Sequence, residues 1–188
     1  MAVKTFTTGE VLTAADTNTY LNNGGLVYIG AVTATSGSTI QVDNVFSATY
    51  DSYRVVVSDL RTAAATAITY KLRNSGGVSS ASYYWGGIYL AAYGTATVTA
   101  TTTANTSSFD LLSVASATST GFTFDVMGPF LAQRTTITGI PADNRTGGNP
   151  RIAVSGFHDV STSYTGFDII STQTITNAIV RVYGYRQA

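Results

Sequence analysis

The sequence predicts an all-β fold, a jelly-roll-like β-sandwich preceded by a short helical segment at the N-terminus. From residue 26 onward, short runs of β-branched and aromatic residues alternate with polar ones and are separated by Gly, Asn and Ser. No helical stretch of useful length interrupts these runs. Many evenly spaced strands without intervening helices are typical of two packed sheets, with a closed barrel as the alternative. We therefore expect an attachment segment at residues 1–25 and a β-sandwich domain at residues 26–188.

The attachment segment is expected to contain one short helix. Thr13 is a suitable N-cap, and Asp16 three residues later completes a capping-box arrangement. Tyr20 and Leu21 supply apolar surface before the sequence Asn-Asn-Gly-Gly at residues 22–25 ends the helix. A helix of about ten residues is marginally stable alone in water, so it needs a surface to lie against. That surface belongs either to a neighbouring subunit or to the chain's own domain.

Strands are expected throughout the rest of the chain. Their ranges are 26–35, 39–46, 53–59, 67–74, 83–93, 95–102, 108–114, 121–127, 135–140, 151–157, 166–171 and 178–185. The Thr-rich stretch near residue 100 is included because Thr is a strong strand former. The segment 141–150 is flanked by prolines and predicts the most exposed loop. Its candidate surface residues are Asp143, Asn144 and Arg145.

Composition excludes several classes of function. Charged residues make up 11% of the 188 residues, against about 25% in a typical globular chain. The 10 basic and 10 acidic residues balance, and no basic block is present, so we expect no nucleic-acid partner. The chain has no cysteine for disulfides or thiolate metal sites, and we expect no cofactor. Without a signal peptide or a long apolar run, we expect a soluble protein made in a cytoplasm, with no membrane insertion.

Candidate catalytic or metal-binding residues are sparse. His158 is the single histidine and is followed by Asp159, a pair with no triad or metal-site spacing, so we expect a histidine in a loop. Single aspartates are scattered among the strands and turns, and any two of them that met in space would suit glycoside cleavage. Asp143 and Asn144 suit calcium chemically but lack the spacing of an EF-hand loop. We expect no catalytic residue and no bound metal.

Aromatic residues cluster in the expected strand 83–93. Alternation sends some of them to each face of the sheet, and Gly86-Gly87 indicates a bulge or hairpin. Rings on the outer face, beside Ser and Thr hydroxyls, stack on sugars or anchor a protein interface. The alternative is that these rings pack in the core. The candidate ligand or interface residues are Tyr83, Tyr84, Trp85 and Tyr89.

Three stretches of the chain form distinct motifs: F-x-x-G-x-x-L-T-A-A-D-x-N-x-x-L at residues 6–21, FSATYDSYRVVV at residues 46–57 and VYGYR at residues 182–186. Together they resemble structural proteins of tailed bacteriophages, in particular minor tail and fibre proteins. The start is similar to their opening pattern F-x-x-G-x-x-L-T-A-A-D-x-N-x-x-L, with Thr17 as a mild departure. The segment FSATYDSYRVVV at residues 46–57 resembles a strand of the β-domain that often follows, and VYGYR at residues 182–186 resembles its last strand. The matching residues of the opening pattern are Phe6, Gly9, Leu12, Thr13, Ala14, Ala15, Asp16, Asn18 and Leu21.

The resemblance implies a virion component, assembled in the host cytoplasm, that attaches to other virion proteins through its N-terminal segment. The attachment residues it implies are Phe6, Leu12, Thr13, Asp16, Asn18, Tyr20 and Leu21. A β-domain with few charges has little means of blunting its sheet edges, so we expect a homotrimer that covers them. Three functions remain open: a tail-associated knob that binds host-surface glycan, a capsid decoration protein with a mechanical role, and a polysaccharide depolymerase.

Overall fold

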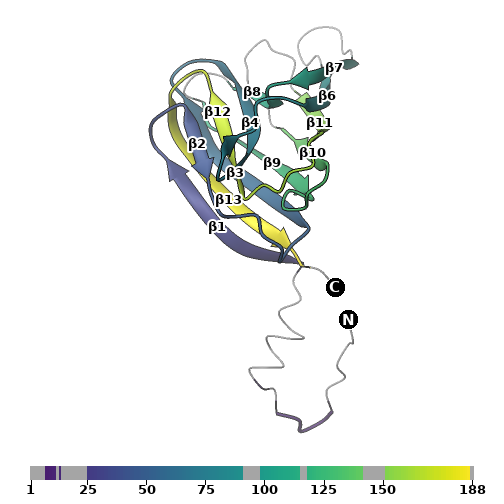
Figure 1. Ribbon diagram of the computed structural model, residues 1–188. Helices are drawn as coiled ribbons and strands as arrows, with labels where there is room; N and C mark the ends of the chain where they lie inside the picture. The colour runs from purple at the N-terminus through teal and green to yellow at the C-terminus, as the bar shows by residue number, and fades with distance from the viewer. Residues whose placement is uncertain are drawn as a thin grey trace.

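The computed structural model describes residues 7–11, 13, 25–90, 98–114, 118–141 and 151–186. Every regular element in these residues is a β-strand (Figure 1). The strands are β1 (Leu26–Ala34), β2 (Thr39–Val42), β3 (Ser52–Thr62), β4 (Thr66–Asn74), β5 (Gly77–Val78), β6 (Tyr83–Leu90), β7 (Val98–Thr106), β8 (Phe109–Val114), β9 (Thr120–Met127), β10 (Thr135–Ile140), β11 (Arg151–His158), β12 (Gly166–Ser171) and β13 (Ile175–Tyr185).

The strands form two antiparallel sheets. The larger sheet has eight strands in the order β1-β13-β3-β9-β10-β11-β6-β7. The smaller has five, in which β2, β12 and β4 lie side by side and both β5 and β8 pair with the remaining edge of β4. Neighbours in the sheets are mostly distant in sequence, so the fold depends on long-range pairing rather than on local hairpins.

Aromatic rings join the two sheets in a common core. Tyr70 on β4 and Phe167 on β12 both contact Phe124 on β9, with ring centroids 5.3 and 6.1 Å apart. On β3 the side chains alternate between buried and half-buried, with Tyr53, Val55 and Val57 turned inward, which is the period-two pattern the sequence predicts. The result is a β-sandwich whose centre lies between β3, β9, β4 and β12.

The β10, β11, β6 and β7 half of the larger sheet is supported from inside by β8. Phe109 on β8 contacts Trp85 on β6 at a centroid distance of 6.3 Å. Close packing here requires Gly156 on β11, because a Cβ at that position would overlap the Tyr84 carbonyl oxygen and lie 2.8 Å from the Phe109 ring. At the rim, β7 is exposed along most of its length.

The sequence located twelve of these strands, with small differences at the ends. Strand β2 ends at Val42 rather than at residue 46, because the backbone N–H groups of Val45 and Phe46 both bond to Thr165 O instead of to a neighbouring strand. Strand β13 begins earlier, at Ile175. The two-residue strand β5 was missed because so short an element shows no alternation. The expected N-terminal helix lies outside the described residues except for Thr13, which is not in a helix or strand.

Candidate functional site

The outward face of the larger sheet carries a continuous row of cross-strand neighbours, which we call the outward row. Each member lies directly opposite the next in the strand register, so that one residue from each of the eight strands takes part. Because side chains alternate along every strand, all eight positions lie on the same face of the sheet. In order from β1 to β7 the residues are Tyr28, Tyr183, Arg54, Asp125, Thr138, Ser155, Gly86 and Thr102.

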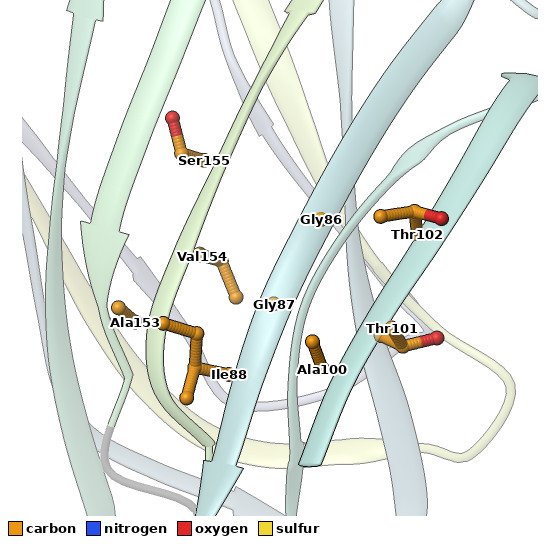
Figure 2. Close-up of a pocket in the computed structure, with 9 residues that line it drawn as sticks. All are labelled: Gly86, Gly87, Ile88, Ala100, Thr101, Thr102, Ala153, Val154 and Ser155. Atoms are coloured by element: carbon orange, nitrogen blue, oxygen red, sulfur yellow. The ribbon is translucent and has the colours of Figure 1, made fainter. Parts of the chain in front are cut away.

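Three shallow hollows lie along the outward row. The first, of about 250 Å³, is formed by β11, β6 and β7, and Figure 2 shows its nine lining residues, among them Gly86, Thr102 and Ser155. The second, of about 310 Å³, extends from β11 across β10 and β9 to Arg54 and shares Ser155 with the first. The third, of about 390 Å³, shares Asp125 with the second and reaches Tyr185. The hollows therefore form one series across the strands.

An ion pair lies at the junction of the second and third hollows. Arg54 on β3 donates from Nε and Nη2 to the two carboxylate oxygens of Asp125 on β9, each at 2.9 Å. The Tyr185 hydroxyl donates to Asp125 Oδ1 at 2.9 Å, and the guanidinium lies 5.5 Å from the centre of the Tyr185 ring. The Arg54 side chain is 40% exposed and that of Asp125 is 25% exposed. Both groups therefore remain accessible from the hollows.

These contacts hold Asp125 ionised. The hydrogen bond from Arg54 is the main cause that lowers the pKa of Asp125, and the hydrogen bond from Tyr185 lowers it further against the opposing effect of burial. The same pairing raises the pKa of Arg54. Burial is the main cause that raises the pKa of Tyr185, helped by its bond to the carboxylate. At neutral pH the site is thus a neutral pair of opposite charges with a protonated phenol beside it.

Aromatic and aliphatic side chains flank the outward row. On one side Tyr84 and Phe157 are directly opposed on β6 and β11 and their rings stack at 5.0 Å. Arg134, paired with Asp159 at 2.8 Å, covers Phe157 with its guanidinium 4.2 Å from the ring centre. On the other side Ile140 is 71% exposed and Ile88 is 41% exposed. Ligand sites are lined mostly by apolar and aromatic side chains with a few placed polar groups, and Ile88 and Ile140 line the first and second hollows beside the polar row.

Exposed apolar side chains are concentrated on this face. Among the described residues nine large hydrophobic side chains are exposed, and six of them belong to outward-facing positions of the larger sheet. Such a concentration indicates a surface that contacts another molecule rather than scattered exposure. The six are Leu26, Tyr28, Ile88, Val98, Met127 and Ile140.

The four aromatic residues predicted as ligand contacts are placed differently from one another. Tyr83 is fully buried, and its hydroxyl accepts a hydrogen bond from Leu72 N at 2.8 Å, so this ring belongs to the core and is unavailable to a ligand. Trp85 also points inward, toward Phe109. Tyr84 faces outward beside the outward row. The side chain of Tyr89 lies outside the described residues.

Most of the predicted attachment residues lie outside the described part of the chain, as do Asp143, Asn144 and Arg145. Residues 7–11 form a local turn in which Glu10 N donates to Thr7 O at 3.0 Å and Thr7 N donates to the Glu10 carboxylate at 3.1 Å. Gly9 in this turn has a φ of 88°, a backbone conformation that favours glycine. Thr13 is exposed. The undescribed residues of the attachment set are Phe6, Leu12, Asp16, Asn18, Tyr20 and Leu21.

His158 is not a loop residue, contrary to the prediction. It is the last residue of β11 and is fully buried. Ser79 Oγ lies 2.7 Å from its Nε2, and the Tyr83 and Tyr164 rings pack against the imidazole at 4.4 and 5.3 Å. Asp159 instead turns to the surface and pairs with Arg134. The two neighbours diverge and do not form a catalytic pair.

Carboxylates do not gather in the three hollows, whose lining includes Asp125 alone. Asp43 and Asp168 approach each other elsewhere, where both pair with Arg73, at 3.0 and 2.8 Å. Within the described ranges, no group of three or more His, Cys, Asp or Glu side chains is close enough to hold a metal ion. In the same residues no helix is long and apolar enough to cross a membrane.

Comparisons with known proteins do not assign this chain to a family. No protein-family model matches the sequence, and no curated protein sequence matches it significantly. Among solved structures, the chain aligns with the CBM2 module of the evolved Dit of Lactobacillus casei BL23 phage J-1, at 10% identity and a TM-score of 0.26. The alignment covers 80% of this chain and 70% of that module. At so low a TM-score neither the fold nor the function of that module is carried over to this chain.

The sequence alone did not predict the outward row. Its members come from eight strands spread over 156 positions, from Tyr28 to Tyr183, and their proximity depends entirely on strand order and register. The one available signal was the FSATYDSYRVVV segment, which contains Arg54, together with VYGYR, which contains Tyr183 and Tyr185. Tyr183 lies opposite Arg54 in the sheet, so these two segments meet at one end of the row.

Proposed function

We propose that the chain is a non-enzymatic structural protein of a bacteriophage virion whose β-sandwich binds saccharide on the host surface. The observation that carries the saccharide-binding part is the outward row. It combines the exposed Tyr28 ring, beside the half-buried Tyr183, with hydroxyls and a paired Arg54 and Asp125 that line a series of hollows. Aromatic faces stack on sugar rings, and hydroxyls and carboxylates bond to sugar hydroxyls. The virion part rests on the sequence landmarks at both ends of the chain.

We further infer that eight of the strands form a jelly roll. Numbered in chain order, β1, β2, β3, β4, β8, β9, β12 and β13 place the first, eighth, third and sixth in one sheet and the second, seventh, fourth and fifth in the other. Two Greek keys folded into two sheets produce this order. Jelly rolls occur in viral capsid and lectin domains. Because a fold does not fix a function, the proposal depends on the outward face.

Two insertions complete the proposed binding face. Strands β5 to β7 are inserted between β4 and β8, and β10 and β11 between β9 and β12. Of these strands, β10, β11, β6 and β7 extend the larger sheet beyond β9 and supply Thr138, Ser155, Gly86 and Thr102 of the outward row, whereas β5 pairs with β4 in the smaller sheet. The eight-strand roll alone supplies only the tyrosines and the ion pair. We therefore assign the insertions to ligand binding and the roll to stability.

Competition with infecting particles tests this function. Purified full-length chain, added in excess, is expected to reduce particle adsorption to host cells, because it occupies the same surface saccharide. Periodate oxidation of the cells, which cleaves sugars that carry neighbouring hydroxyls, is expected to abolish binding of the purified chain. Bovine serum albumin at the same concentration is the control for nonspecific coverage of the cells.

The outcome also separates the alternatives. Unchanged adsorption at saturating protein would contradict the host-binding role and leave a mechanical decoration protein of the head or tail.

For the assembled state we propose a homotrimer held to other virion proteins through residues 1–25. The proposal includes no cofactor, no nucleic acid and no membrane insertion.

A further inference from the structure

We propose that the ligand of the outward row is an uncharged polysaccharide chain that lies across the strands of the larger sheet. This inference rests on the saccharide-binding function proposed above and adds the charge class of the ligand, its direction and the role of each part of the row. The row includes all eight strands, and neighbouring strands lie about 4.8 Å apart, so its length is roughly 34 Å. A site of this length fits a chain of sugars better than a single one.

The charge of the lining selects an uncharged ligand. Of all the residues that line the three hollows, only Arg54 and Asp125 are charged. Both carboxylate oxygens of Asp125 are bonded to the Arg54 guanidinium, so each charge is already compensated. An anionic chain would need cations that are not paired in this way. A neutral chain needs only donors and acceptors, which the outward row supplies.

The two ends of the outward row have different roles. At the β1 end, Tyr28 and Tyr183 contact each other with ring centroids 5.7 Å apart, and Tyr28 is 58% exposed. These rings offer apolar faces to the faces of sugar rings. At the β7 end, Ser155 and Thr102 are exposed on either side of Gly86. The missing side chain at Gly86 leaves space for the chain to approach the sheet backbone.

A second copy of the protein fits this face less well. The centres of interfaces between copies are enriched in apolar side chains and depleted of charged ones. Here the exposed Ile140 and Ile88 lie beside the row, and the centre of the row contains Arg54, Asp125 and Thr138. The polar row bordered by apolar flanks matches a sugar chain, which presents hydroxyls at its edges and C–H groups on its faces.

Affinity electrophoresis of the full-length chain tests the inference. The probes are dextran, mannan and galactan as neutral polysaccharides, and polygalacturonate and hyaluronan as anionic ones. We expect retardation by at least one neutral polysaccharide and by neither anionic one. Ser155→Tyr fills the place where the first and second hollows meet and Tyr28→Ala removes an exposed ring, and each is expected to weaken binding about tenfold or more. Thr39→Tyr, at an exposed strand position of the smaller sheet, is the matched control and is expected to bind normally.

A charge variant gives a test whose expected result is a gain of binding, which a folding defect could not produce. Asp125→Asn leaves Arg54 as an uncompensated cation in the second hollow, so this variant is expected to gain retardation by polygalacturonate. That gain requires a folded site. Circular dichroism of every variant confirms that the sandwich is intact.

Several results would overturn the inference. The first is that the unmodified chain binds only the anionic probes. The second is that Ser155→Tyr binds the neutral probes as strongly as the unmodified chain. The third is that the chain binds none of the five probes. If the chain still competes with particles for host cells in those cases, the proposed function stands and only the ligand class fails. If Ser155→Tyr instead dissociates an oligomer of the chain in sedimentation, the outward row is an interface between copies. Failure of both competition and polysaccharide binding rejects the function itself.

Discussion

His158 shows how one buried side chain links distant segments. Its imidazole lies between Tyr83 on β6 and Tyr164 before β12, and Ser79 pairs with it from the loop before β6. Burial is the main cause that lowers its pKa, against opposing effects of a hydrogen bond with the Ala81 backbone and of the nearby Asp159 charge. The folded protein therefore prefers the neutral imidazole more strongly than the unfolded chain does.

A pH dependence of stability follows from this residue. The unfolded chain takes up a proton near the ordinary histidine pKa of about 6.5, before the folded protein does. Stability is therefore complete above that pH and falls as the pH decreases toward 5, by at most about 1.4 kcal/mol per pH unit for one proton. Urea unfolding at a series of pH values measures this slope.

His158→Gln is the matched control, since it removes the only histidine of the chain. We expect a less stable protein whose stability is flat between about pH 7 and pH 5. Asp125, whose pKa is lowered, loses its contribution only at more acid pH, below about 4. A slope that persists in His158→Gln would show that another group is responsible.

At the scale of elements, the FSATYDSYRVVV and VYGYR segments contain the packing residues of one corner. The Tyr53 hydroxyl accepts from Ser47 N and donates to Ser47 O, both at 2.8 Å, and so fixes the segment before β3. Phe46 packs on the Tyr53 ring at 4.7 Å. Tyr50 lies against Gly184, where a Cβ would come within 2.5 Å of the ring. The FSATYDSYRVVV and VYGYR segments are therefore two parts of a single structural unit.

Tyr53→Phe tests the importance of this corner. The substitution keeps the buried ring but leaves the Ser47 N–H and carbonyl without their partner. We expect a loss of about 1–3 kcal/mol in the free energy of unfolding, measured from urea midpoints. Tyr28→Phe, at a ring that is 58% exposed, is the control and is expected to change stability by less than about 0.5 kcal/mol. If Tyr53→Phe and Tyr28→Phe changed the free energy of unfolding equally, the hydrogen bonds between Tyr53 and Ser47 would make no particular contribution to stability.

Prediction from sequence was accurate for strands and poor for the candidate site, for a physical reason. Alternation and turn residues are local, so β3, β9 and β12 were located to within a few residues. The order of strands is not local. Arg54 and Asp125 are 71 positions apart in sequence, and nothing in either segment indicates that β3 and β9 are neighbours. The inward direction of the Trp85 side chain could not be predicted either. In an alternating strand the sequence shows which residues share a face, but it does not show which of the two faces is buried.

At the scale of the whole molecule, the two edge strands of the larger sheet have little sequence protection against pairing with another chain, apart from an irregularity in β1 between Tyr28 and Gly30. Neither β1 nor β7 contains a charged residue or a proline, and among the described residues each pairs with a strand on one side only. Uncharged edges of nine residues are templates for pairing with another chain unless something covers them. This observation supports the proposed homotrimer.

Sedimentation equilibrium tests the homotrimer, with an expected mass three times the 19.7 kDa of the chain. A lysine at an edge opposes strand pairing, so Thr99→Lys on β7 or Thr33→Lys on β1 is expected to shift the protein to monomer. Met127→Lys, at an exposed position of β9 that pairs with β3 on one side and β10 on the other, is the control and should leave the mass unchanged. A trimer that survives both edge variants would show that subunits meet elsewhere.

The paired ends of β1 and β13 have a mechanical consequence. Arg186 N donates to Gly25 O at 2.9 Å, and Figure 1 shows β1 starting where β13 finishes. A tether through the residues before Gly25 would pull β1 along its own axis, past an antiparallel neighbour to which it is bonded over its whole length. Such a pull loads all the hydrogen bonds between β1 and β13 together in shear, instead of breaking them one after another. In the proposed virion role, this geometry would let the sandwich transmit tension from its N-terminal attachment without unravelling from its first strand.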